Sequence, residues 1–533
     1  MSDARLISVQ VERFKSYEAP TRIELDPLTV ILGRNNGGKS TLIQALLLLK
    51  QTLAHPRRDV PLHLEGPVDA LTLRELTFGW PQEGERVEGP TIEVRWRSTV
   101  DVNAARGAAG WPDVANVVKH TGISWLTEQP ATKTLETALH LFTEESQGRA
   151  RTSRIELRSF DRDGSEHEVV VLRSDAGSSC RWDGQLTEDI EVEYDHFLPL
   201  LQLDRQGLGP RHRGRSWHTG FLLLFDQPLE DLKRILGGLQ YLGSTRDLPP
   251  SVHRPASVPP DDLGVSGEYA AQLIHARQAD LVHYLSPPRV TEAGVELESS
   301  VQARRFVDAT NDVLEHLGVT ARLRLEDVPN IGFRLLFGNA SLTQVGRGLT
   351  YLLPIVELGL FADPLRFRGE LGDQPLEDYR QACHGVTHIA LEEPESHLHP
   401  KVQTRLAHWM VALAMSGRQL IVETHSDHLV RRLRGLMARA QPGDALEVWL
   451  RDSVSIVEVE QEQGRSRICA SRLTPQGSVA EHWPADFMDE ASDEERAIYY
   501  AGLDKPAEPA EERSPDLQIE HDMGPEPEPE DEP

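Results

Sequence analysis

The sequence has few cysteines, and they lie far apart. Cys180, Cys383 and Cys469 are the three cysteines of the 533 residues, and no two form a Cys-x-x-Cys pair. This spacing indicates neither a disulfide framework nor a zinc site. No run approaches the roughly 20 apolar residues that a membrane span needs, and the N-terminus lacks the apolar core of a signal peptide. We therefore expect a cytoplasmic protein that is neither secreted nor anchored in a membrane.

Positive charge is also scarce. The chain has 56 lysines and arginines against 84 aspartates and glutamates, a formal net charge of −28. Because contacts with phosphates need lysine and arginine, this balance counts against a broadly cationic nucleic-acid binder. Eleven acids, two bases and seven prolines lie in residues 505–533, a composition typical of a disordered segment. We interpret this segment as an interaction tail, as an acidic segment that covers a basic surface, or as a solubilising tail without a partner.

The most informative feature that is present is a phosphate-loop motif at residues 33–41. An apolar run at residues 28–32 predicts a buried strand before it, and an apolar helix follows it. The backbone N–H groups of such a loop, together with roughly half a positive charge at the helix N-terminus, can hold a polyphosphate. We expect Lys39 to reach the β- and γ-phosphates and Ser40 to contact Mg²⁺. A glycine-rich turn that matches by chance is the alternative. The nucleotide-binding residues predicted here are Gly33, Arg34, Asn35, Asn36, Gly37, Gly38, Lys39, Ser40 and Thr41.

A second motif follows far along the chain. Residues 387–391 predict another buried strand, which ends in Glu392 and Glu393. In phosphoryl transfer one acid at such a strand end holds Mg²⁺ and the next orients the attacking water, so we assign Glu392 to the metal and Glu393 to the water. Two solvated glutamates are the alternative. A helix at 401–415 and a third apolar strand follow, and His425 stands at the carboxyl end of that strand, where parallel sheets bind ligands.

These motifs resemble the ABC-type ATPase heads of SMC, RecF and OLD proteins, over residues 5 to about 50 and 340 to 435. The resemblance implies an α/β fold, an ABC/SMC-type P-loop NTPase head with β-rich and helical insertions. It also implies that Glu393 is the catalytic glutamate and that His425 contacts the γ-phosphate, with Lys39 completing the catalytic set. The segment Ser396-His397-Leu398-His399 is similar to the loop that crosses the dimer interface of those heads.

Residues 339–360 are similar to the signature segment of the same family, which contacts the γ-phosphate bound by a partner protomer. Gly346, Gly348 and Thr350 occupy the positions that make this contact. Threonine stands where the family usually has serine, Tyr351 follows where glutamine is common, and Glu392 replaces the aspartate of many ABC heads. The glutamine that usually completes the magnesium shell is not assigned. A turn before an apolar core helix is the alternative interpretation.

The middle of the chain distinguishes it from ATPase heads that carry a long coiled-coil arm. Helical stretches near 227–242, 266–286 and 301–317 are short and broken by glycine and proline, so no long coiled-coil arm is expected. We divide the chain into five parts. They are the first part of the ATPase head (1–54), a β-rich lobe (55–225), a helical lobe (226–335), the second part of the head (336–500) and the acidic tail (501–533).

Two local arginine clusters are the candidates for contact with DNA. They are Arg211, Arg213 and Arg215 beside Trp217, and Arg431, Arg432 and Arg434 after His425. The first cluster offers phosphate pairing and base stacking, or it is an exposed loop. The second is a solvated helix face, a site for an acidic partner, or a region coupled to the nucleotide.

A second catalytic activity is not indicated. OLD nucleases add a Toprim domain with a late Asp-x-Asp, and none follows His425; Asp486 and Asp489 have the wrong spacing. The Asp161-Arg162-Asp163 segment predicts a turn in the β-rich lobe. Any nuclease is therefore expected on a separate chain.

The expected function is an ATPase that binds ATP and Mg²⁺ and dimerises, or forms a higher homo-oligomer, through composite sites. Resemblance to the ATPases of the Septu and PARIS systems implies an anti-phage sensor or regulator with a separate effector, a nuclease or toxin. A RecF- or SMC-like DNA-binding ATPase in repair or chromosome maintenance is the alternative. A scaffold that binds ATP without hydrolysis is the third.

Overall fold

The computed structural model describes residues 4–81, 88–102, 113–128, 132–146, 148–161, 164–174, 177–187, 190–203, 212–365, 372–383 and 385–479. Contacts divide the chain into a unit of residues 1–484 and a second unit of residues 485–533. The predicted acidic tail and the Asp486–Asp489 segment lie outside the described residues, as do Arg162, Asp163 and Arg211.

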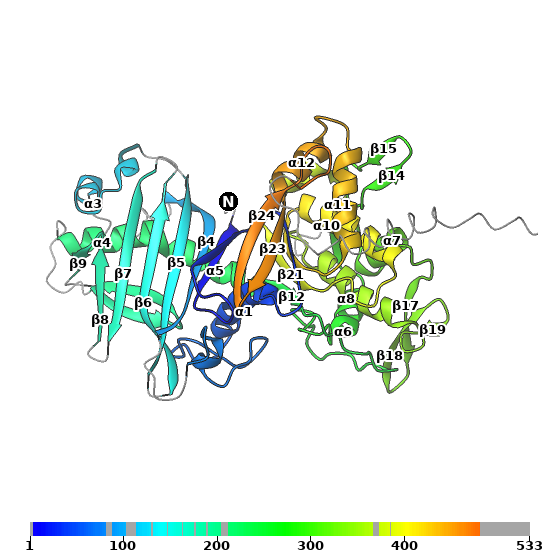
Figure 1. The fold of residues 1–533 in the computed structure, drawn as a ribbon, viewed down its shortest axis with the longest axis horizontal. Coiled ribbons are helices and arrows are strands. Elements are labelled where there is room, and N and C mark those ends of the chain that lie inside the picture. The colour runs from blue at the N-terminus through cyan, green and yellow to red at the C-terminus, as the bar shows by residue number, and fades with distance from the viewer. Residues whose placement is uncertain are drawn as a thin grey trace, which may run out of the picture. The chain divides into compact units, whose positions relative to one another are not determined.

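A six-stranded, mostly parallel sheet forms the centre of the first unit (Figure 1). Its order is β12 (Gln240–Leu242), β21 (Thr387–Glu392), β22 (Arg418–Glu423), β3 (Leu28–Gly33), β23 (Val454–Glu462) and β24 (Arg465–Arg472). The first five strands are parallel, and β24 pairs antiparallel with β23. All residues of β3 and β22 are buried, as expected of parallel strands covered on both faces. The carboxyl ends of β21, β22 and β3 therefore meet at one edge.

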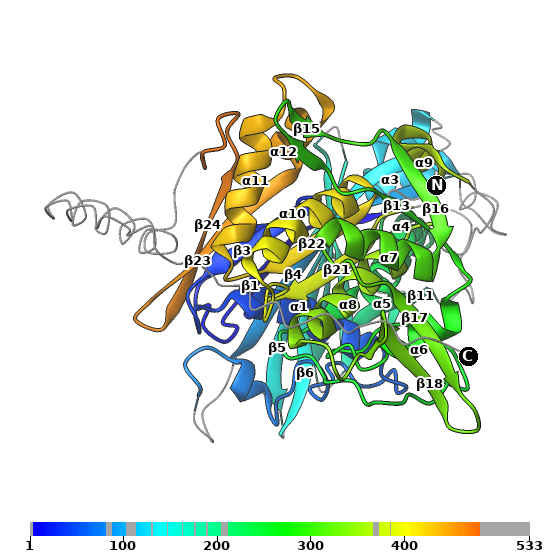
Figure 2. The same ribbon diagram turned by 90° about the vertical axis from the view of Figure 1, so that its right-hand side faces the viewer.

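Two helices pack on one face of this sheet, between it and a second sheet (Figure 1). Helix α1 (Lys39–Leu53) contacts β3 and β22 on one side and β1 on the other, and α5 (Gln227–Gly238) contacts β21 and β4. Helices α10 (Pro400–Met415) and α11 (Asp427–Arg439) lie side by side (Figure 2), and α10 packs on β22 and β3. Sequence placed the strands at 28–32, 387–391 and 418–423 and the helix at 401–415, and the structure confirms them to within a residue.

The second sheet has eight antiparallel strands. In sheet order they are β2 (Thr21–Glu24), β1 (Arg5–Glu12), β4 (Glu88–Asp101), β5 (Thr132–Ser146), β6 (Arg149–Phe160), β7 (Glu166–Ser174), β8 (Gly177–Trp182) and β9 (Gln185–Leu186). The β-rich segment thus extends a sheet that the N-terminal strands β1 and β2 begin. Its side chains share one core with α1 and α5, in which Trp96 is fully buried and donates to the Pro228 carbonyl at 2.8 Å.

The remaining elements are short. Near the eight-stranded sheet lie η1 (Leu73–Leu76), α3 (Val114–Thr121), η2 (Ser124–Glu128), β10 (Ile190–Asp195), β11 (Leu198–Leu203), α4 (Arg213–Phe221) and the π-helical turn η3 (Leu222–Asp226). Later in the chain are α6 (Ala270–Arg277), β13 (Leu281–Leu285), β14 (Arg289–Thr291), β15 (Gly294–Glu296), β16 (Ser300–Arg305), α7 (Phe306–Leu317), β17 (Leu323–Val328), β18 (Gly332–Phe337), β19 (Ala340–Ser341), α8 (Arg347–Phe361), β20 (Gln374–Pro375), α9 (Leu376–Ala382) and α12 (Ala445–Ser453). The segment expected to be helical, 226–335, therefore contains short strands between its helices.

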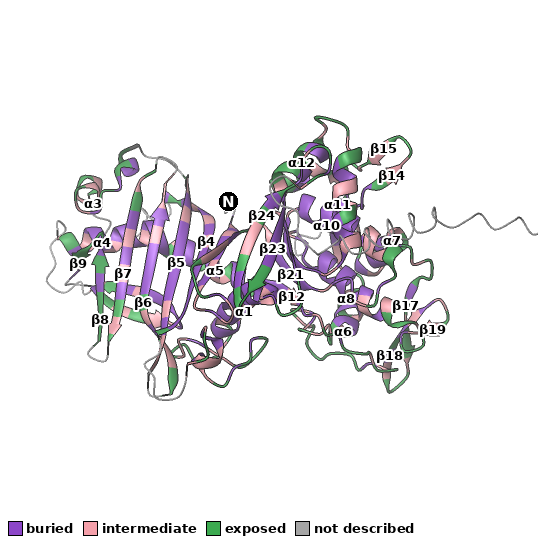
Figure 3. Ribbon diagram, viewed as in Figure 1, coloured by how far each residue is buried: buried purple, intermediate pink, exposed green. Residues whose placement is uncertain are grey.

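Helix length separates this chain from proteins with long coiled-coil arms. Among the described residues the longest helix is α10, with 16 residues. The predicted α/β fold without a long coiled coil is confirmed. None of the described helices has the length and apolar character to cross a bilayer. Burial follows the layers, since the inner strands of the central sheet are buried whereas the edge strand β24 alternates between exposed and buried residues (Figure 3).

Candidate nucleotide-binding site

The phosphate loop joins the end of β3 to the start of α1, and two of its glycines are required by close contacts. Gly33 has a φ of 147°, and a Cβ there would lie 2.3 Å from the carbonyl oxygen of Val459. Gly38 has a φ of 97°, and a Cβ there would lie 2.5 Å from Ser16 Oγ. Gly38 is also the N-cap of α1 and provides no side-chain cap. The first N–H groups of the helix are therefore free of a capping side chain, which suits an anion.

Hydroxyl groups from distant segments support this loop. Ser466 Oγ in β24 donates to the Gly37 carbonyl at 2.6 Å, and the Tyr17 hydroxyl donates to the Gly38 carbonyl at 3.1 Å. These bonds fix the peptide groups of the loop. Sequence reasoning missed both residues, because only the sheet order brings β24 and the turn after β1 beside the loop.

Two glutamates end neighbouring strands at this edge of the sheet. Glu392 of β21 and Glu423 of β22 are paired in register. Ser40 Oγ donates to Glu423 Oε1 at 3.0 Å, and Lys39 Nζ lies 3.8 Å from the same oxygen. Glu392 instead bonds with the hydroxyl of Tyr241. The carboxylate that touches the loop is thus Glu423, which sequence reasoning did not single out, and the metal role of Glu392 stays a prediction.

Burial makes these carboxylates costly to keep charged. It raises the pKa of Glu423 to about 7, with the charge of Glu392 as the next cause, and it also raises the pKa of Glu392. Glu392 Oε1 and Glu423 Oε2 are buried without a hydrogen-bond partner. Such oxygens are the ligands that Mg²⁺ prefers, so the two acids and the Ser40 hydroxyl fit a magnesium ion.

A cluster of three or more metal-binding side chains is not needed for that fit. The described part of the chain contains no group of three His, Cys, Asp or Glu side chains arranged for a metal. Mg²⁺ at nucleotide sites is usually held by one or two carboxylates, with water and phosphate oxygens as its other ligands.

Glu393 and His425 face the same cavity as the phosphate loop. This cavity has a volume of about 1190 Å³, and Lys39, Glu393, Glu423 and His425 are among its lining residues. Ser396 Oγ donates to Glu393 Oε2 at 3.0 Å. Burial, and next the Lys39 ammonium, lower the pKa of His425. At neutral pH the imidazole is therefore neutral and keeps one N–H to donate.

A buried arginine holds the backbone of the two acids. Arg246 donates to the Glu392 carbonyl at 3.0 Å and to the Glu393 carbonyl at 3.3 Å. Glu393 has a φ of 42°, a conformation that L-residues rarely adopt, and its N–H donates to the Glu423 carbonyl at 2.8 Å. Burial lowers the pKa of Arg246 to about 10, so it remains charged at neutral pH. It is a positioning residue that sequence reasoning missed.

An exposed tryptophan lies on another wall of the cavity. Trp80 lines it together with Phe78, Gly79 and the turn between β23 and β24. The residue is 61% exposed. A large apolar ring left in solvent beside a phosphate loop is suited to stack on a base. The signal in the sequence is only a Trp-Pro pair in a loop, which does not by itself indicate a ligand.

The signature-like segment does not line the cavity of the phosphate loop in the same chain. Gly346 is the exposed N-cap of α8 without a side-chain cap, and nothing lies within 4 Å of a Cβ built on it. Gly348 packs against the His397 carbonyl, 2.9 Å from a built Cβ, and the Tyr351 and His397 rings are 4.7 Å apart. Thr350 is buried and lines a different cavity. Within one chain Gly348 and Tyr351 contact the 396–399 loop, and the contact of Gly346, Gly348 and Thr350 with a partner's phosphate stays a prediction.

The two arginine clusters lie in different surroundings. Trp217 is buried, and its Nε1 donates to the His120 carbonyl at 3.2 Å, so the predicted base stacking on Trp217 is wrong. Arg431 pairs with Asp427 at 3.4 Å, and Arg434 donates to the Gly477 carbonyl at 2.7 Å. Arg432 faces a second cavity.

Comparisons with known proteins match both halves of the site. The model of a family described as AAA ATPase domain matches residues 5–90. The model of a family described as AAA domain, putative AbiEii toxin, Type IV TA system, matches residues 377–431. The first segment contains the phosphate loop, and the second contains Glu392, Glu393, Glu423 and His425. Segments on both sides of the middle region are therefore similar to AAA-family ATPase domains.

Three SMC head domains are among the solved structures that the chain matches. The SMC head domain from Thermotoga maritima has a TM-score of 0.32 at 13% identity, covering 88% of this chain and 100% of its own. The SMC head bound to the C-terminal winged-helix domain of ScpA has a TM-score of 0.38 at 12% identity, covering 88% and 98%. The head from Pyrococcus furiosus with an extended coiled coil, bound to the C-terminal domain of ScpA, has a TM-score of 0.34 at 10% identity, covering 93% and 100%. No curated protein sequence matches the chain.

Proposed function

We propose that this chain binds and hydrolyses ATP and that ATP controls its association with a second copy. One observation carries the proposal. The edge of one parallel sheet brings a phosphate loop, two buried carboxylates that end neighbouring strands, Glu393 and His425 to one site. Phosphoryl transfer needs these groups, since its catalysis rests on positioning and charge stabilisation.

Each residue has a distinct role in this proposal. Lys39 and the N–H groups at the start of α1 hold the β- and γ-phosphates. Ser40, Glu423 and Glu392 would hold Mg²⁺, which would neutralise charge that develops on the phosphates. Glu393 accepts a hydrogen bond from the attacking water and orients it towards the γ-phosphate.

Hydrogen bonds from neighbouring residues hold Glu393 and His425 in place. Arg246 and the Ser396 hydroxyl fix the backbone and the carboxylate of Glu393. His425 donates its ring N–H to a γ-phosphate oxygen, and its own backbone N–H is held by Glu395 Oε1 at 2.6 Å. Trp80 stacks on the adenine.

Dimerisation completes the site in this proposal. The uncapped start of α8 at Gly346 is exposed and does not line the cavity of its own phosphate loop. A partner's γ-phosphate can accept hydrogen bonds from its N–H groups. ATP then bridges two copies, and hydrolysis removes the phosphate that both copies hold, which makes the chain a nucleotide-controlled switch.

The experiment is a comparison of Glu393→Gln with Lys39→Ala. Glu393→Gln is expected to bind ATP, to lose phosphate release, and to accumulate as a dimer with ATP in size-exclusion chromatography with light scattering. Lys39→Ala is expected to lose ATP binding and stay in the nucleotide-free state. Normal hydrolysis by Glu393→Gln would show that the base is assigned wrongly.

We further propose that the switch regulates a separate effector, a nuclease or toxin, in bacterial defence against phage. The support is the resemblance of the sequence to the Septu and PARIS ATPases and the match of residues 377–431 to a family whose description names a putative toxin of a toxin–antitoxin system. A phage-plating assay with the gene and its neighbours tests this, because Glu393→Gln should abolish protection. The repair alternative instead predicts ATP-dependent, salt-sensitive binding of duplex DNA.

A further inference from the structure

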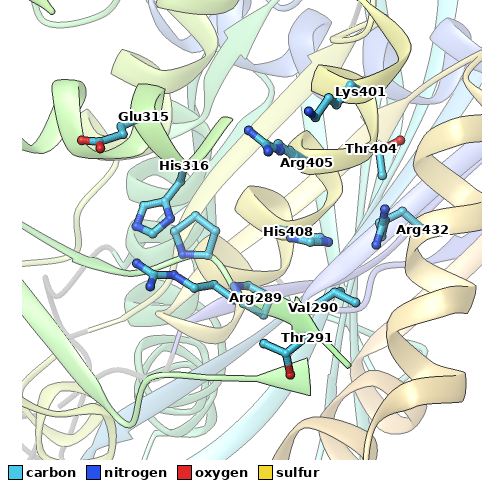
Figure 4. A pocket seen from close by; sticks show the side chains of 12 residues that line it. Arg289, Val290, Thr291, Glu315, His316, Lys401, Thr404, Arg405, His408 and Arg432 are labelled. Atoms are coloured by element: carbon cyan, nitrogen blue, oxygen red, sulfur yellow. The ribbon is translucent and has the colours of Figure 1, made fainter. Parts of the chain in front are cut away.

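A second cavity, of about 610 Å³, lies between helices α7, α10 and α11 and the start of β14 (Figure 4). Four cationic side chains and one carboxylate line it. The cations are Arg289, Lys401, Arg405 and Arg432, and the carboxylate is Glu315. This local excess of positive charge stands out in a chain whose formal net charge is −28.

The cavity is built from one face of α10. Thr404 and Arg405 lie three and four residues after Lys401, and His408 lies four and three residues after them, so these side chains lie on the same side of the helix. Arg432 faces them from α11, and Figure 4 shows it near His408. Residues far apart in the sequence thus converge on one space.

The charges of these four cations are not balanced by ion pairs. In the described part of the chain Arg289, Lys401, Arg405 and Arg432 form no ion pair and no hydrogen bond to another side chain. Burial lowers the pKa of Arg432, and the charges of Arg439, outside the cavity lining, and of Arg405 lower it further. Converging cations without an anion are unfavourable, and a bound anion removes that cost.

His408 provides an independent observation. The residue is 9% exposed, its Nε2 is buried without a hydrogen-bond partner, and its ring also hydrogen-bonds with the backbone of Pro288. Burial, and next Arg432 and Arg405, lower its pKa to about 4, so the ring is neutral at pH 7. A buried ring nitrogen without a partner costs free energy unless a ligand or water bonds with it.

We propose that this cavity binds a phosphate-bearing small molecule of nucleotide size, separately from the ATP site. The two cavities share no lining residue. Arginine guanidinium groups recognise phosphate oxygens in pairs, and three of the four cations that line the cavity are arginines. Pro287, Pro288 and Val290 give apolar surface for an organic group. The volume lies in the range of roughly 300–1,000 Å³ that small-molecule sites occupy.

Calorimetric titration of the full chain tests this proposal. Lys39→Ala is the background, because it weakens phosphate binding at the first site. The probes are inorganic pyrophosphate, adenosine 5′-monophosphate and a short single-stranded oligonucleotide. The two cavity variants are Arg405→Glu and Arg289→Glu, each tested separately. The control is Arg254→Glu, which makes the same change of charge at an exposed arginine outside both cavities.

We expect saturable binding of pyrophosphate and of the monophosphate, weakened roughly tenfold or more by Arg289→Glu and by Arg405→Glu and unchanged by Arg254→Glu. Arg289 is exposed at the start of β14, so its variant keeps the test valid if Arg405→Glu does not fold. Absence of saturable binding, or binding that neither pocket variant weakens, overturns the proposal. So does binding of the oligonucleotide alone, which would identify a nucleic-acid surface. If instead the proposed ATP site is wrong, the unmodified chain will not hydrolyse ATP, and that result does not depend on the second cavity.

Discussion

Ser40 Oγ donates a 3.0 Å hydrogen bond to Glu423 Oε1, which joins two residues that are 383 positions apart in the sequence. The bond connects the phosphate loop to β22, the strand beside β3 in the sheet. Glu392, the acid that the sequence motif indicates, lies one strand further away. Ser40, which is expected to contact Mg²⁺, is therefore held by Glu423 and not by Glu392.

Substitution Glu423→Gln tests this contact. The amide keeps the size of the side chain and the bond from Ser40 but removes a negative charge and weakens the oxygen as a metal ligand. We expect the Mg²⁺ concentration for half-maximal ATP hydrolysis to rise by at least the roughly 10- to 100-fold that is typical of losing a group that orients a metal ligand, because Glu423 is proposed to bind the metal itself. A Mg²⁺ titration of the rate measures it. Glu191→Gln, an exposed glutamate of β10, is the control, and an unchanged Mg²⁺ requirement would remove Glu423 from the site.

The proposed stacking of Trp80 on the adenine base of ATP can be tested by substitution. Stacking on an aromatic ring contributes roughly 1–3 kcal/mol per base, so Trp80→Ala should raise the KM for ATP about tenfold or more. The kcat should change little, because the base is bound equally in the ground state and the transition state. Trp80→Phe should keep most of the affinity. Equal KM values for Trp80→Ala and a Trp449→Phe control would show that Trp80 does not contact the nucleotide.

His388 predicts how stability depends on pH. Its ring is buried, its Nε2 accepts the N–H of Leu6 at 3.3 Å, and burial lowers its pKa to about 4. Below pH 6.5 the unfolded chain binds a proton that the folded chain does not. The free energy of unfolding should therefore fall as pH falls, by roughly 1–2 kcal/mol between pH 7 and 5 from this group. Urea unfolding of His388→Asn should show a smaller loss over that window, and a loss equal to that of the unmodified chain would contradict the assignment.

The sequence predicted the parts of the site that local pattern determines. The strands of residues 28–33, 387–392 and 418–423 are short apolar runs, and the phosphate loop has a fixed spacing. Each of these signals is contained within about ten residues. The helices found near 227, 270 and 306 also lie within the predicted stretches.

Residues that depend on sheet order were not predictable in the same way. Glu423 looks like the last residue of an apolar strand, and it becomes a partner of Ser40 only because β22 lies beside β3. Arg246 reaches Glu392 and Glu393 because β12 pairs with β21. Trp80 has no local motif at all. The burial of Trp217 likewise follows from tertiary packing, because α4 contacts α3 and Trp217 belongs to the shared core, and the arginines beside it in the sequence give no sign of this.

Complementation between two inactive variants tests the central claim most directly, namely that the ATP site is shared by two copies. Lys39→Ala removes the phosphate-loop cation. Gly346→Asp places a carboxylate at the open start of α8, where the φ of −63° and the empty surroundings tolerate a side chain. Each variant alone should be inactive.

In an equal mixture each heterodimer has one intact site, made of the phosphate loop from the Gly346→Asp copy and the α8 N-terminus from the Lys39→Ala copy. Phosphate release should then recover to about one quarter of the unmodified rate for random pairing of a twofold dimer. Heterodimers are confirmed by co-purification of two different tags. No recovery in a mixture that contains heterodimers would contradict a composite site.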